Sequence, residues 1–255
     1  MKHFEELALL LDDAARQAQA VAQIDPKGEF SLDQAYEIQR ALIERRLARG
    51  NSRTGVKMGF TSRSKMVQMG LSDVIWGRLT GDMAIEEGGT VGFARFVHPR
   101  VEPEIAFVLA KPVTPDMNAA TALSCVEAVA PALEIIDSRY LDFKFGLTDV
   151  VADNASSSGY VIGAWHSPKL DFSNLGLTLN INGRVVQIGS TAAILGHPLR
   201  SLTAAARLAA AAGEPLQAGA VVMAGGATAA EWIRPGAYVS VDMEGLGHAG
   251  FRVGA

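Results

Sequence analysis

Two glutamates stand two residues apart in a stretch that is otherwise typical of a β-strand, residues 101–108, VEPEIAFV. Successive side chains of a strand point to opposite faces, so Glu102 and Glu104 are expected to share one face. Two carboxylates held side by side repel each other unless a cation or a proton lies between them. The pair therefore predicts a partner that neutralises it.

A third acid, Glu134, lies in the similarly apolar run APALEIID. We hypothesise that Glu102, Glu104 and Glu134 bind one divalent metal ion. Three carboxylates without a histidine or cysteine favour a hard cation such as Mg²⁺ or Mn²⁺, whereas zinc prefers nitrogen or sulfur ligands. The alternative is that the glutamates form ion pairs with arginines such as Arg100 or Arg139, and the pattern alone leaves both open.

Lys57 is the next candidate, because it interrupts a strand-like run, TGVKMGFTS. A lysine in such a run is either partly buried and paired with an acid, or snorkels out of an edge strand. The functional interpretation is that it faces a substrate carboxylate or enolate.

Two weaker patterns also suggest a ligand site. The polar stretch DVVADNASSS offers hydrogen-bonding groups that serve either a ligand or a turn, namely Asp153, Asn154 and Ser156. Gly225 and Gly226 follow an apolar run and would let backbone N–H groups approach an anion closely. The sequence contains no dinucleotide fingerprint, phosphate-binding loop or nucleophile elbow.

The elements that must position these residues fall into two parts. Residues 1–52 are expected to form a helical lobe, with apolar residues at helical spacing over 4–22. Ser31 and Gln34 form a capping box that predicts the start of a second helix, which ends at Gly50.

Residues 53–255 alternate short apolar runs with glycine-rich turns. The acid-bearing strand, 101–110, contains Pro103, which predicts a sheet edge or a bulge there. A turn of helix is expected after Ser62 and a polar loop at 149–158. Further elements are expected as helices at 119–129 and 198–212, strands at 133–136, 160–162 and 221–223, and hairpins at 177–188 and 238–253. Without a β-α-β rhythm, the pattern predicts an α+β fold with a mostly antiparallel, curled sheet.

The length, composition and net charge of the chain argue against several classes of protein. The chain has 255 residues, 49% of them hydrophobic, and a net charge of only −4, which favours neither nucleic acid nor a membrane surface as a partner. Its apolar runs are too short to span a bilayer, and the N-terminus lacks an export signal. Cys125 is the only cysteine, so no intrachain disulfide can form. We therefore expect a cytoplasmic protein in which Cys125 is a small buried side chain.

Taken together, several segments resemble the fumarylacetoacetate-hydrolase-like superfamily, in its branch of 2-oxo-acid decarboxylases and hydratases from the meta-cleavage degradation of aromatic compounds. The matching segments are VKMGFTS, HPRVEPEIAF, PALEIIDSR, VVADNASS, AAILGHPL and AGGATAA. They occur in the order typical of the family and extend from about Lys57 to the C-terminus.

This resemblance implies a curled, mixed β-roll core over 53–255, with Mg²⁺ or Mn²⁺ held by Glu102, Glu104 and Glu134, and Lys57 in the active site. It also implies a small 2-oxo dicarboxylic acid as substrate, a homo-oligomer, and a possible complex with the pathway's 2-hydroxypentadienoate hydratase. The residues expected to line the substrate site are Ile75, Asp153, Asn154, Ser156, Gly225 and Gly226.

The two branches differ at one position. Hydratases of this group carry an aspartate two residues before the glycine that here is Gly77, and this chain has Ile75 there. KMVQMG and GGATAA also resemble the decarboxylases, so decarboxylation of 4-oxalocrotonate (2-oxo-3-hexenedioate) to 2-hydroxypenta-2,4-dienoate and CO₂ is expected. The alternatives are hydration of 2-hydroxypenta-2,4-dienoate, a non-catalytic partner subunit, and carbon–carbon bond hydrolysis, for which the N-terminal helices show no clear His/Glu pair.

The expected chemistry needs few groups. A metal that chelates the 2-oxo and C1 carboxylate oxygens would act as a Lewis acid and stabilise the dienolate left when CO₂ departs. That step needs no water-activating base, whereas hydration requires proton transfer at carbon. Lys57 would orient a carboxylate or help to protonate the dienolate, and the sequence leaves these two roles open.

Overall fold

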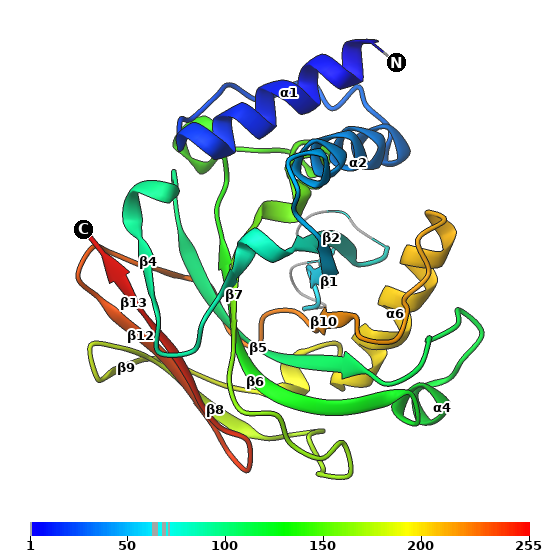
Figure 1. Ribbon diagram of the computed structural model, residues 1–255, viewed down its shortest axis with the longest axis vertical. Helices are drawn as coiled ribbons and strands as arrows, with labels where there is room; N and C mark the ends of the chain where they lie inside the picture. The colour runs from blue at the N-terminus through cyan, green and yellow to red at the C-terminus, as the bar shows by residue number, and fades with distance from the viewer. Residues whose placement is uncertain (1, 63–65, 68–69, 71) are drawn as a thin grey trace.

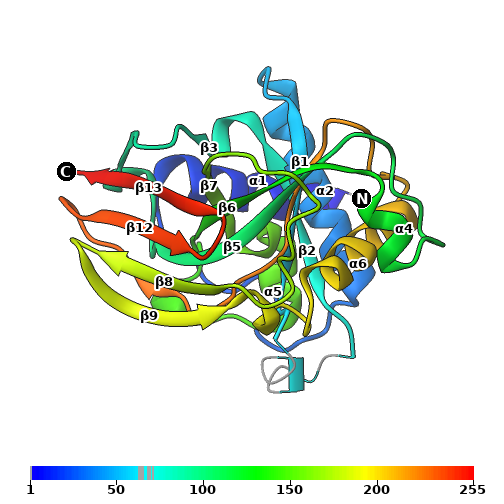
Figure 2. The same ribbon diagram turned by 90° about the horizontal axis from the view of Figure 1, so that it is seen from below.

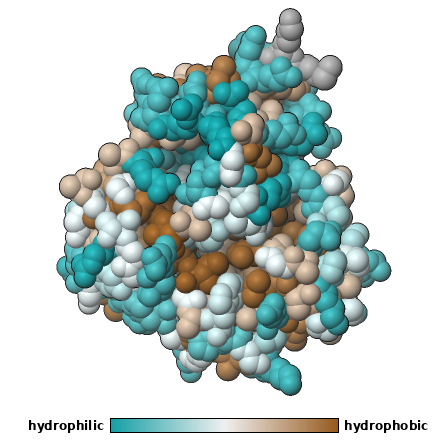
Figure 3. Space-filling model, in the orientation of Figure 1, coloured by the Kyte–Doolittle hydropathy of each residue, from teal (hydrophilic) through white to brown (hydrophobic). Residues whose placement is uncertain are grey.

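The structure is a computed structural model that describes residues 2–62, 66–67, 70 and 72–255. The turn of helix expected after Ser62 lies largely outside the described residues. Two helices, α1 (Lys2–Gln17) and α2 (Leu32–Ala48), lie together above a roll of strands (Figure 1). Figure 3 shows hydrophilic side chains over these helices and hydrophobic ones gathered across the middle of the same face.

The helical lobe is built largely as the sequence predicts. The capping box is confirmed, since the Ser31 side chain accepts from the Gln34 N–H and the Gln34 side chain accepts from the Ser31 N–H. The first helix is shorter than expected, because Ala18 adopts a left-handed φ of 49° and the chain then turns to bridge Val21 to Tyr140. The lobe has no core to itself: its buried apolar side chains pack against those of β2 and α5.

The roll consists of two sheets. The first is eight-stranded, in the order β2-β1-β10-β5-β6-β7-β3, with β11 beside β5. Its strands are β1 (Arg53–Gly59), β2 (Ile75–Thr80), β3 (Ala84–Ile85), β5 (Arg100–Leu109), β6 (Val126–Ile136), β7 (Ser157–Ile162), β10 (Val221–Met223) and β11 (Glu231–Trp232). The second is five-stranded, in the order β4-β13-β12-β8-β9. Its strands are β4 (Thr90–Gly92), β8 (Gly176–Ile181), β9 (Arg184–Ser190), β12 (Tyr238–Met243) and β13 (Gly247–Gly254).

Further helices and 3₁₀ turns connect the strands. They are α4 (Ala119–Leu123), α5 (Leu147–Ala152) and α6 (Pro198–Ala211), with 3₁₀ turns η1 (Gly81–Met83), η2 (Phe93–Arg95), η3 (Leu141–Phe143), η4 (Asn154–Ser156) and η5 (Thr191–Ala193). Figure 2 shows β9, β8, β12 and β13 side by side, below and beside the long strands β5 and β6. Most strand pairs are antiparallel, but β1 with β10, β3 with β7 and β4 with β13 are parallel. The α+β class and the curled, mixed sheet are therefore confirmed.

The prediction of a helix over 119–129 is wrong beyond the first turn. Helix α4 ends at Leu123 and β6 begins at Val126, well before the strand expected at 133–136. Val126 and Val129 pair with Leu109 and Phe107 of β5, and these long-range contacts override the local helical pattern. Cys125 between the two elements is buried, as expected.

The prediction that Pro103 marks a sheet edge or a bulge is also wrong. Strand β5 lies in the interior of the sheet, between β10 and β6, and its register shift falls between Val108 and Leu109. The proline is tolerated because it faces the gap between β10 and β11. Its carbonyl oxygen accepts there from the N–H of Ala227, at 2.8 Å, and its own missing N–H interrupts no regular ladder.

The polar loop expected at 149–158 is replaced by regular structure. Helix α5 ends at Ala152, and β7 begins at Ser157. Between them, Asn154, Ala155 and Ser156 all have left-handed backbone angles, with φ of 52°, 49° and 60°. Such a turn is costly for residues with a Cβ, so the surrounding contacts must hold it in place.

Both predicted hairpins are confirmed. Asn182 and Gly183 have φ of 53° and 74°, as a type I′ turn between β8 and β9 requires. Strands β12 and β13 pair in the second hairpin. Within the described residues, no helix combines the length and apolar character needed to cross a membrane.

Candidate metal centre and active site

The pairing of β5 with β6 brings the three predicted acids together. Glu102 lies directly opposite Glu134 in the antiparallel register, and Glu104 follows on the same face of β5. One carboxylate oxygen from each of the three lies within 4.8 Å of the other two. Glu104 and Glu134 are fully buried and Glu102 is nearly so.

This cluster has the chemistry of a divalent metal site. Burial and the neighbouring charge of Glu134 raise the pKa of Glu104 well above its usual value, and burial likewise raises the pKa of Glu134 despite the charge of Lys57. One oxygen of Glu104, Oε2, accepts from the Gly225 N–H at 2.7 Å, but Oε1 is buried without a hydrogen-bond donor in the part of the chain that the structure describes. A hard cation would satisfy this oxygen and relieve the repulsion, so the residues present fit Mg²⁺ or Mn²⁺.

Lys57 lies beside the cluster, with Nζ 2.9 Å from Glu134 Oε2. The contact is a buried ion pair, because both side chains are almost completely excluded from solvent. Burial alone would lower the pKa of Lys57, but the charges of Glu134, Glu104 and Glu102 outweigh it and raise the pKa. The alternative that Lys57 snorkels out of an edge strand is wrong, because Lys57 is buried and β1 lies between β2 and β10.

The two arginines considered as partners of the glutamates are placed differently. Arg139 binds Asp153, with Nε 2.5 Å from Oδ1, so it does not neutralise the cluster. Arg100 precedes Glu102 by two residues on β5, and its guanidinium lies 4.0 Å from the ring centres of Phe143 and Trp232. These stacking contacts hold the cation at a fixed place beside the cluster.

A cavity of about 350 Å³ opens beside Glu102. Its wall is mostly apolar, and the side chains that form this wall include Phe60, Ile75, Ile136, Phe143, Phe145 and Val150. Lys57 and Arg100 add two cations, and Ser156 adds a hydroxyl. Of the residues predicted to meet the substrate, Lys57, Ile75 and Ser156 therefore line the cavity together with Glu102.

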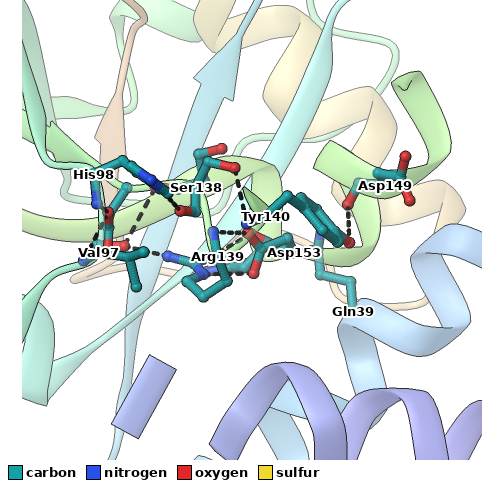
Figure 4. A network of polar contacts seen from close by, with 12 residues as sticks. Gln39, Val97, His98, Ser138, Arg139, Tyr140, Asp149 and Asp153 are labelled. Atoms are coloured by element: carbon teal, nitrogen blue, oxygen red, sulfur yellow. Dashed lines mark hydrogen bonds and ion pairs between the residues drawn. The ribbon is translucent and has the colours of Figure 1, made fainter. Parts of the chain in front are cut away.

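Asp153 and Asn154 lie behind this wall. Figure 4 shows Asp153 facing Arg139, which donates to it from both its backbone N–H and its side chain. The Asn154 side chain accepts from the Arg78 N–H at 2.8 Å and donates to the Arg78 carbonyl oxygen at 2.9 Å. These contacts hold the left-handed turn at 154–156 against β2, and direct contact of either side chain with a substrate stays a prediction.

Gly225 and Gly226 make room for the glutamates. Gly225 has φ of 104°, and a Cβ there would lie 2.2 Å from Thr61 Oγ1. A Cβ on Gly226 would lie 2.9 Å from the Glu102 carboxylate. The diglycine thus allows the chain to pass close to both Glu102 and Glu104, and its contact with a substrate stays a prediction.

Sequence reasoning missed two residues at this site. Ser157 Oγ donates to Glu134 Oε1 at 2.9 Å and so fixes that carboxylate. The sequence pattern indicates Arg100 only as a partner of the acids, whereas it also lines the cavity. Its spacing from Glu102 was the available signal, since residues two apart on a strand share a face.

Comparisons with known proteins agree with this geometry. The family model described as fumarylacetoacetate (FAA) hydrolase C-terminal matches residues 68–254. A 4-oxalocrotonate decarboxylase from a Pseudomonas species is 55% identical over 245 residues, which cover 96% of each chain. A 2-keto-4-pentenoate hydratase from Paraburkholderia xenovorans strain LB400 is 35% identical over 247 residues, which cover 95% of this chain and 92% of the relative.

Among solved structures, 4-oxalocrotonate decarboxylase from Pseudomonas putida G7, complexed with magnesium and adipate, superposes with a TM-score of 0.95 at 37% identity. The match covers 99% of this chain and 97% of that chain. The same enzyme has also been solved complexed with calcium and acetate, and it superposes with a TM-score of 0.94. The chain therefore belongs to the fumarylacetoacetate hydrolase C-terminal family.

Proposed function

We propose that this protein is a metal-dependent carboxy-lyase that converts 4-oxalocrotonate to 2-hydroxypenta-2,4-dienoate and CO₂. The observation that carries the proposal is the buried cluster of Glu102, Glu104 and Glu134, which opens on an apolar cavity. It is supported by 55% identity to a 4-oxalocrotonate decarboxylase over nearly the whole chain.

The three glutamates would hold Mg²⁺ or Mn²⁺, which supplies a Lewis acid for the 2-oxo group when bound. The relative from Pseudomonas putida G7 was solved with magnesium, in line with this choice of ion. The charges of three carboxylates, one divalent ion and protonated Lys57 sum to zero. Arg100 then leaves the cavity with a surplus positive charge, which favours an anionic substrate.

The side chains of the cavity have separable roles. Arg100, fixed between Phe143 and Trp232, offers N–H donors to a substrate carboxylate. Lys57 Nζ lies close enough to the cluster to orient a carboxylate or to give a proton to the dienolate. The apolar wall excludes water from the dienolate and disfavours the charge of the carboxylate that departs.

Ile75 favours decarboxylation over hydration. It contributes an aliphatic side chain to the cavity, where an acid would be needed to manage protons during hydration. Hydration of 2-hydroxypenta-2,4-dienoate is the second candidate, supported by 35% identity to a 2-keto-4-pentenoate hydratase.

One experiment separates these functions. The purified protein is incubated with Mg²⁺ and 4-oxalocrotonate, and CO₂ release and formation of 2-hydroxypenta-2,4-dienoate are measured; the dienoate is then offered alone. Release of CO₂ supports the decarboxylase. Consumption of the dienoate without CO₂ release from the diacid supports the hydratase. Inactivity on both substrates, with Mg²⁺ bound, supports a non-catalytic partner subunit.

The enzyme's assembly and cellular compartment follow from the same reasoning. We also propose a homo-oligomer, and a complex with the pathway's hydratase in which the dienoate passes from one active site to the other. The single, buried Cys125 is consistent with a reducing compartment, the cytoplasm. Light-scattering chromatography of the protein alone, and then mixed with the hydratase, tests both assemblies by their masses.

A further inference from the structure

A second cleft, of about 260 Å³, lies between the C-terminal ends of helices α1 and α2 and the roll. Five arginines line it, against two aspartates. It shares no lining residue with the cavity beside Glu102. We call it the arginine cleft.

Most of these arginines are neutralised by carboxylates from outside the cleft. Three are held in this way: Arg16 by Asp13, Arg49 by both oxygens of Asp12, and Arg139 by Asp153. The two that remain are Arg46, from α2 of the lobe, and Arg95, from η2 of the roll. They are the groups through which the cleft would act on a ligand.

Arg46 and Arg95 meet at a single acid, Asp82. Arg46 Nη1 lies 3.4 Å from Asp82 Oδ2, a long contact, while Thr80 Oγ1 donates to the other oxygen at 2.5 Å. Arg95 Nη2 donates to the backbone carbonyl oxygen of Asp82, at 3.1 Å, rather than to its carboxylate. The Asp82 carboxylate therefore contacts the guanidinium of Arg46 but not that of Arg95.

The second acid of the cleft, Asp137, is engaged elsewhere. Its carboxylate accepts from the backbone N–H groups of Val97 and His98, at 2.9 and 2.5 Å. It is therefore a bound acceptor and not a free counterion for Arg46.

One donor of Arg46, its Nε, lacks an acceptor within the described residues. The residue is only 9% exposed, and its Nε is buried with no hydrogen-bond partner among the residues that the structure describes. Buried N–H donors in native proteins almost always have an acceptor, so the described residues leave Arg46 incompletely paired. Burial also lowers the pKa of Arg46, even though Asp82 opposes this change.

We propose that the arginine cleft binds a small oxyanion, a phosphate or a carboxylate, between Arg46 of the lobe and Arg95 of the roll. Guanidinium groups present paired N–H donors that match such oxygens. An anion beside Arg46 would give its guanidinium a closer acceptor than Asp82, which lies 3.4 Å away. The bound anion connects α2 to η2. Because it binds the packed lobe and not the unfolded chain, it stabilises the folded protein.

The test uses the full chain without divalent metal, so that the glutamate cluster repels anions. Inorganic phosphate and adipate are titrated separately by calorimetry at constant ionic strength, with the melting temperature followed in parallel. We expect saturable binding of at least one anion and a rise in melting temperature. Arg46→Met and Arg95→Met should each weaken that binding at least tenfold.

Arg40→Met is the matched control, because it removes the same charge from an exposed position of α2, beside Glu44. It should leave the binding unchanged. Arg95 is exposed, so Arg95→Met keeps the test valid even if Arg46→Met does not fold. Phosphate binding alone identifies inorganic phosphate chemistry, and adipate binding alone identifies a carboxylate ligand.

Three results would overturn the proposal: no saturable binding of either anion, binding that survives both substitutions in the cleft, or equal weakening by Arg40→Met. Decarboxylation is not the measurement, so the outcome is independent of the proposed catalytic function.

Discussion

Glu102 of β5 and Glu134 of β6 are directly opposite each other in an antiparallel pair, in the interior of the sheet. Like charges in such a pair destabilise a sheet. The fold accepts this cost at a buried position and adds Glu104 beside it, which increases the repulsion. An arrangement of this kind needs a compensating cation or proton, and Lys57 supplies one positive charge beside Glu134.

The first prediction concerns the stability of the metal-free protein. Glu104→Gln removes a buried carboxyl group whose ionised form is disfavoured by burial and by Glu134, so it should raise the free energy of unfolding without metal by about 1 kcal/mol. The same change removes a ligand, so Mg²⁺ should no longer raise the melting temperature and decarboxylation should fall at least 100-fold. Chemical unfolding and thermal melts with and without Mg²⁺ measure both effects.

Glu127→Gln is the control for that substitution, because Glu127 is exposed on β6. It should change neither the metal-free stability nor the response to Mg²⁺. If Glu104→Gln melted earlier than the unaltered protein and still responded to Mg²⁺, the assignment of the metal site would be wrong.

Lys57→Met tests the two roles left open for this lysine. It removes the ion pair with Glu134 and a proton donor from the cavity, so activity should fall by about 10²–10⁴-fold. If Lys57 orients a carboxylate, the loss should appear mainly in KM. If it protonates the dienolate, the loss should appear in kcat and in slower incorporation of solvent deuterium into the product.

Lys57→Arg keeps the charge and serves as the comparison. Recovery of KM but not of kcat in Lys57→Arg would favour proton transfer, because the guanidinium remains protonated. Unchanged kcat and KM in Lys57→Met would remove the residue from the mechanism altogether.

A second group of ion pairs lies within the helical lobe, where Asp12 of α1 binds Arg45 and Arg49 of α2. Burial alone would raise the pKa of Asp12, but Arg49 and Arg45 outweigh it and lower the pKa below its usual value. A lowered pKa means that the ionised form stabilises the fold above about pH 4, and that this stability is lost as the pH falls through the folded-state value. Asp12→Asn should therefore reduce the free energy of unfolding at pH 7 by about 1–2 kcal/mol, since both arginines are partly exposed.

The difference between Asp12→Asn and the unaltered protein should stay constant from pH 7 to about pH 4 and shrink below it. Urea unfolding at a series of pH values measures it. The neighbouring Asp13→Asn removes only an exposed contact with Arg16 and should change the stability by less than about 0.5 kcal/mol. Equal effects of the two substitutions would contradict the role given to Asp12.

How far the site can be predicted from sequence depends on the residue. Strand alternation places Glu102 and Glu104 on one face, and the apolar runs around Glu134 and Lys57 make these two residues candidates. The family resemblance joins all four into one site. The sequence alone does not predict the register that sets Glu134 opposite Glu102. Residues 119–129 have a helical pattern, and only pairing with β5 makes the second half of this segment a strand. The local pattern also predicts a sheet edge or a bulge at Pro103, whereas its position beside the gap between two strands depends on the whole sheet.

The turn at 154–156 could not be predicted for a related reason. Three successive residues with a Cβ adopt left-handed angles, and no local propensity favours this. It persists because Asn154 is bonded on both sides to the backbone of Arg78, which is distant in sequence. Gly77 permits the close approach, since a Cβ there would lie 2.6 Å from the Asn154 carbonyl oxygen.

Ile75 is the residue on which the choice of reaction depends. It lines the cavity from β2, opposite Gly59 of β1. Ile75→Asp places a carboxylate in an apolar wall beside the glutamate cluster, where it repels the substrate's anionic end and can hold a proton. We expect decarboxylation of 4-oxalocrotonate to fall at least tenfold and hydration of 2-hydroxypenta-2,4-dienoate to become measurable.

Ile75→Val is the matched control, because it trims the wall without adding charge, and it should keep most of the decarboxylase activity. Both variants are assayed for CO₂ release from the diacid and for loss of the dienoate, with Mg²⁺ saturating. If Ile75→Asp decarboxylated as fast as Ile75→Val, the apolar wall would not determine the reaction. The difference between the two chemistries would then have to arise from the charged groups of the cavity, Lys57 and Arg100.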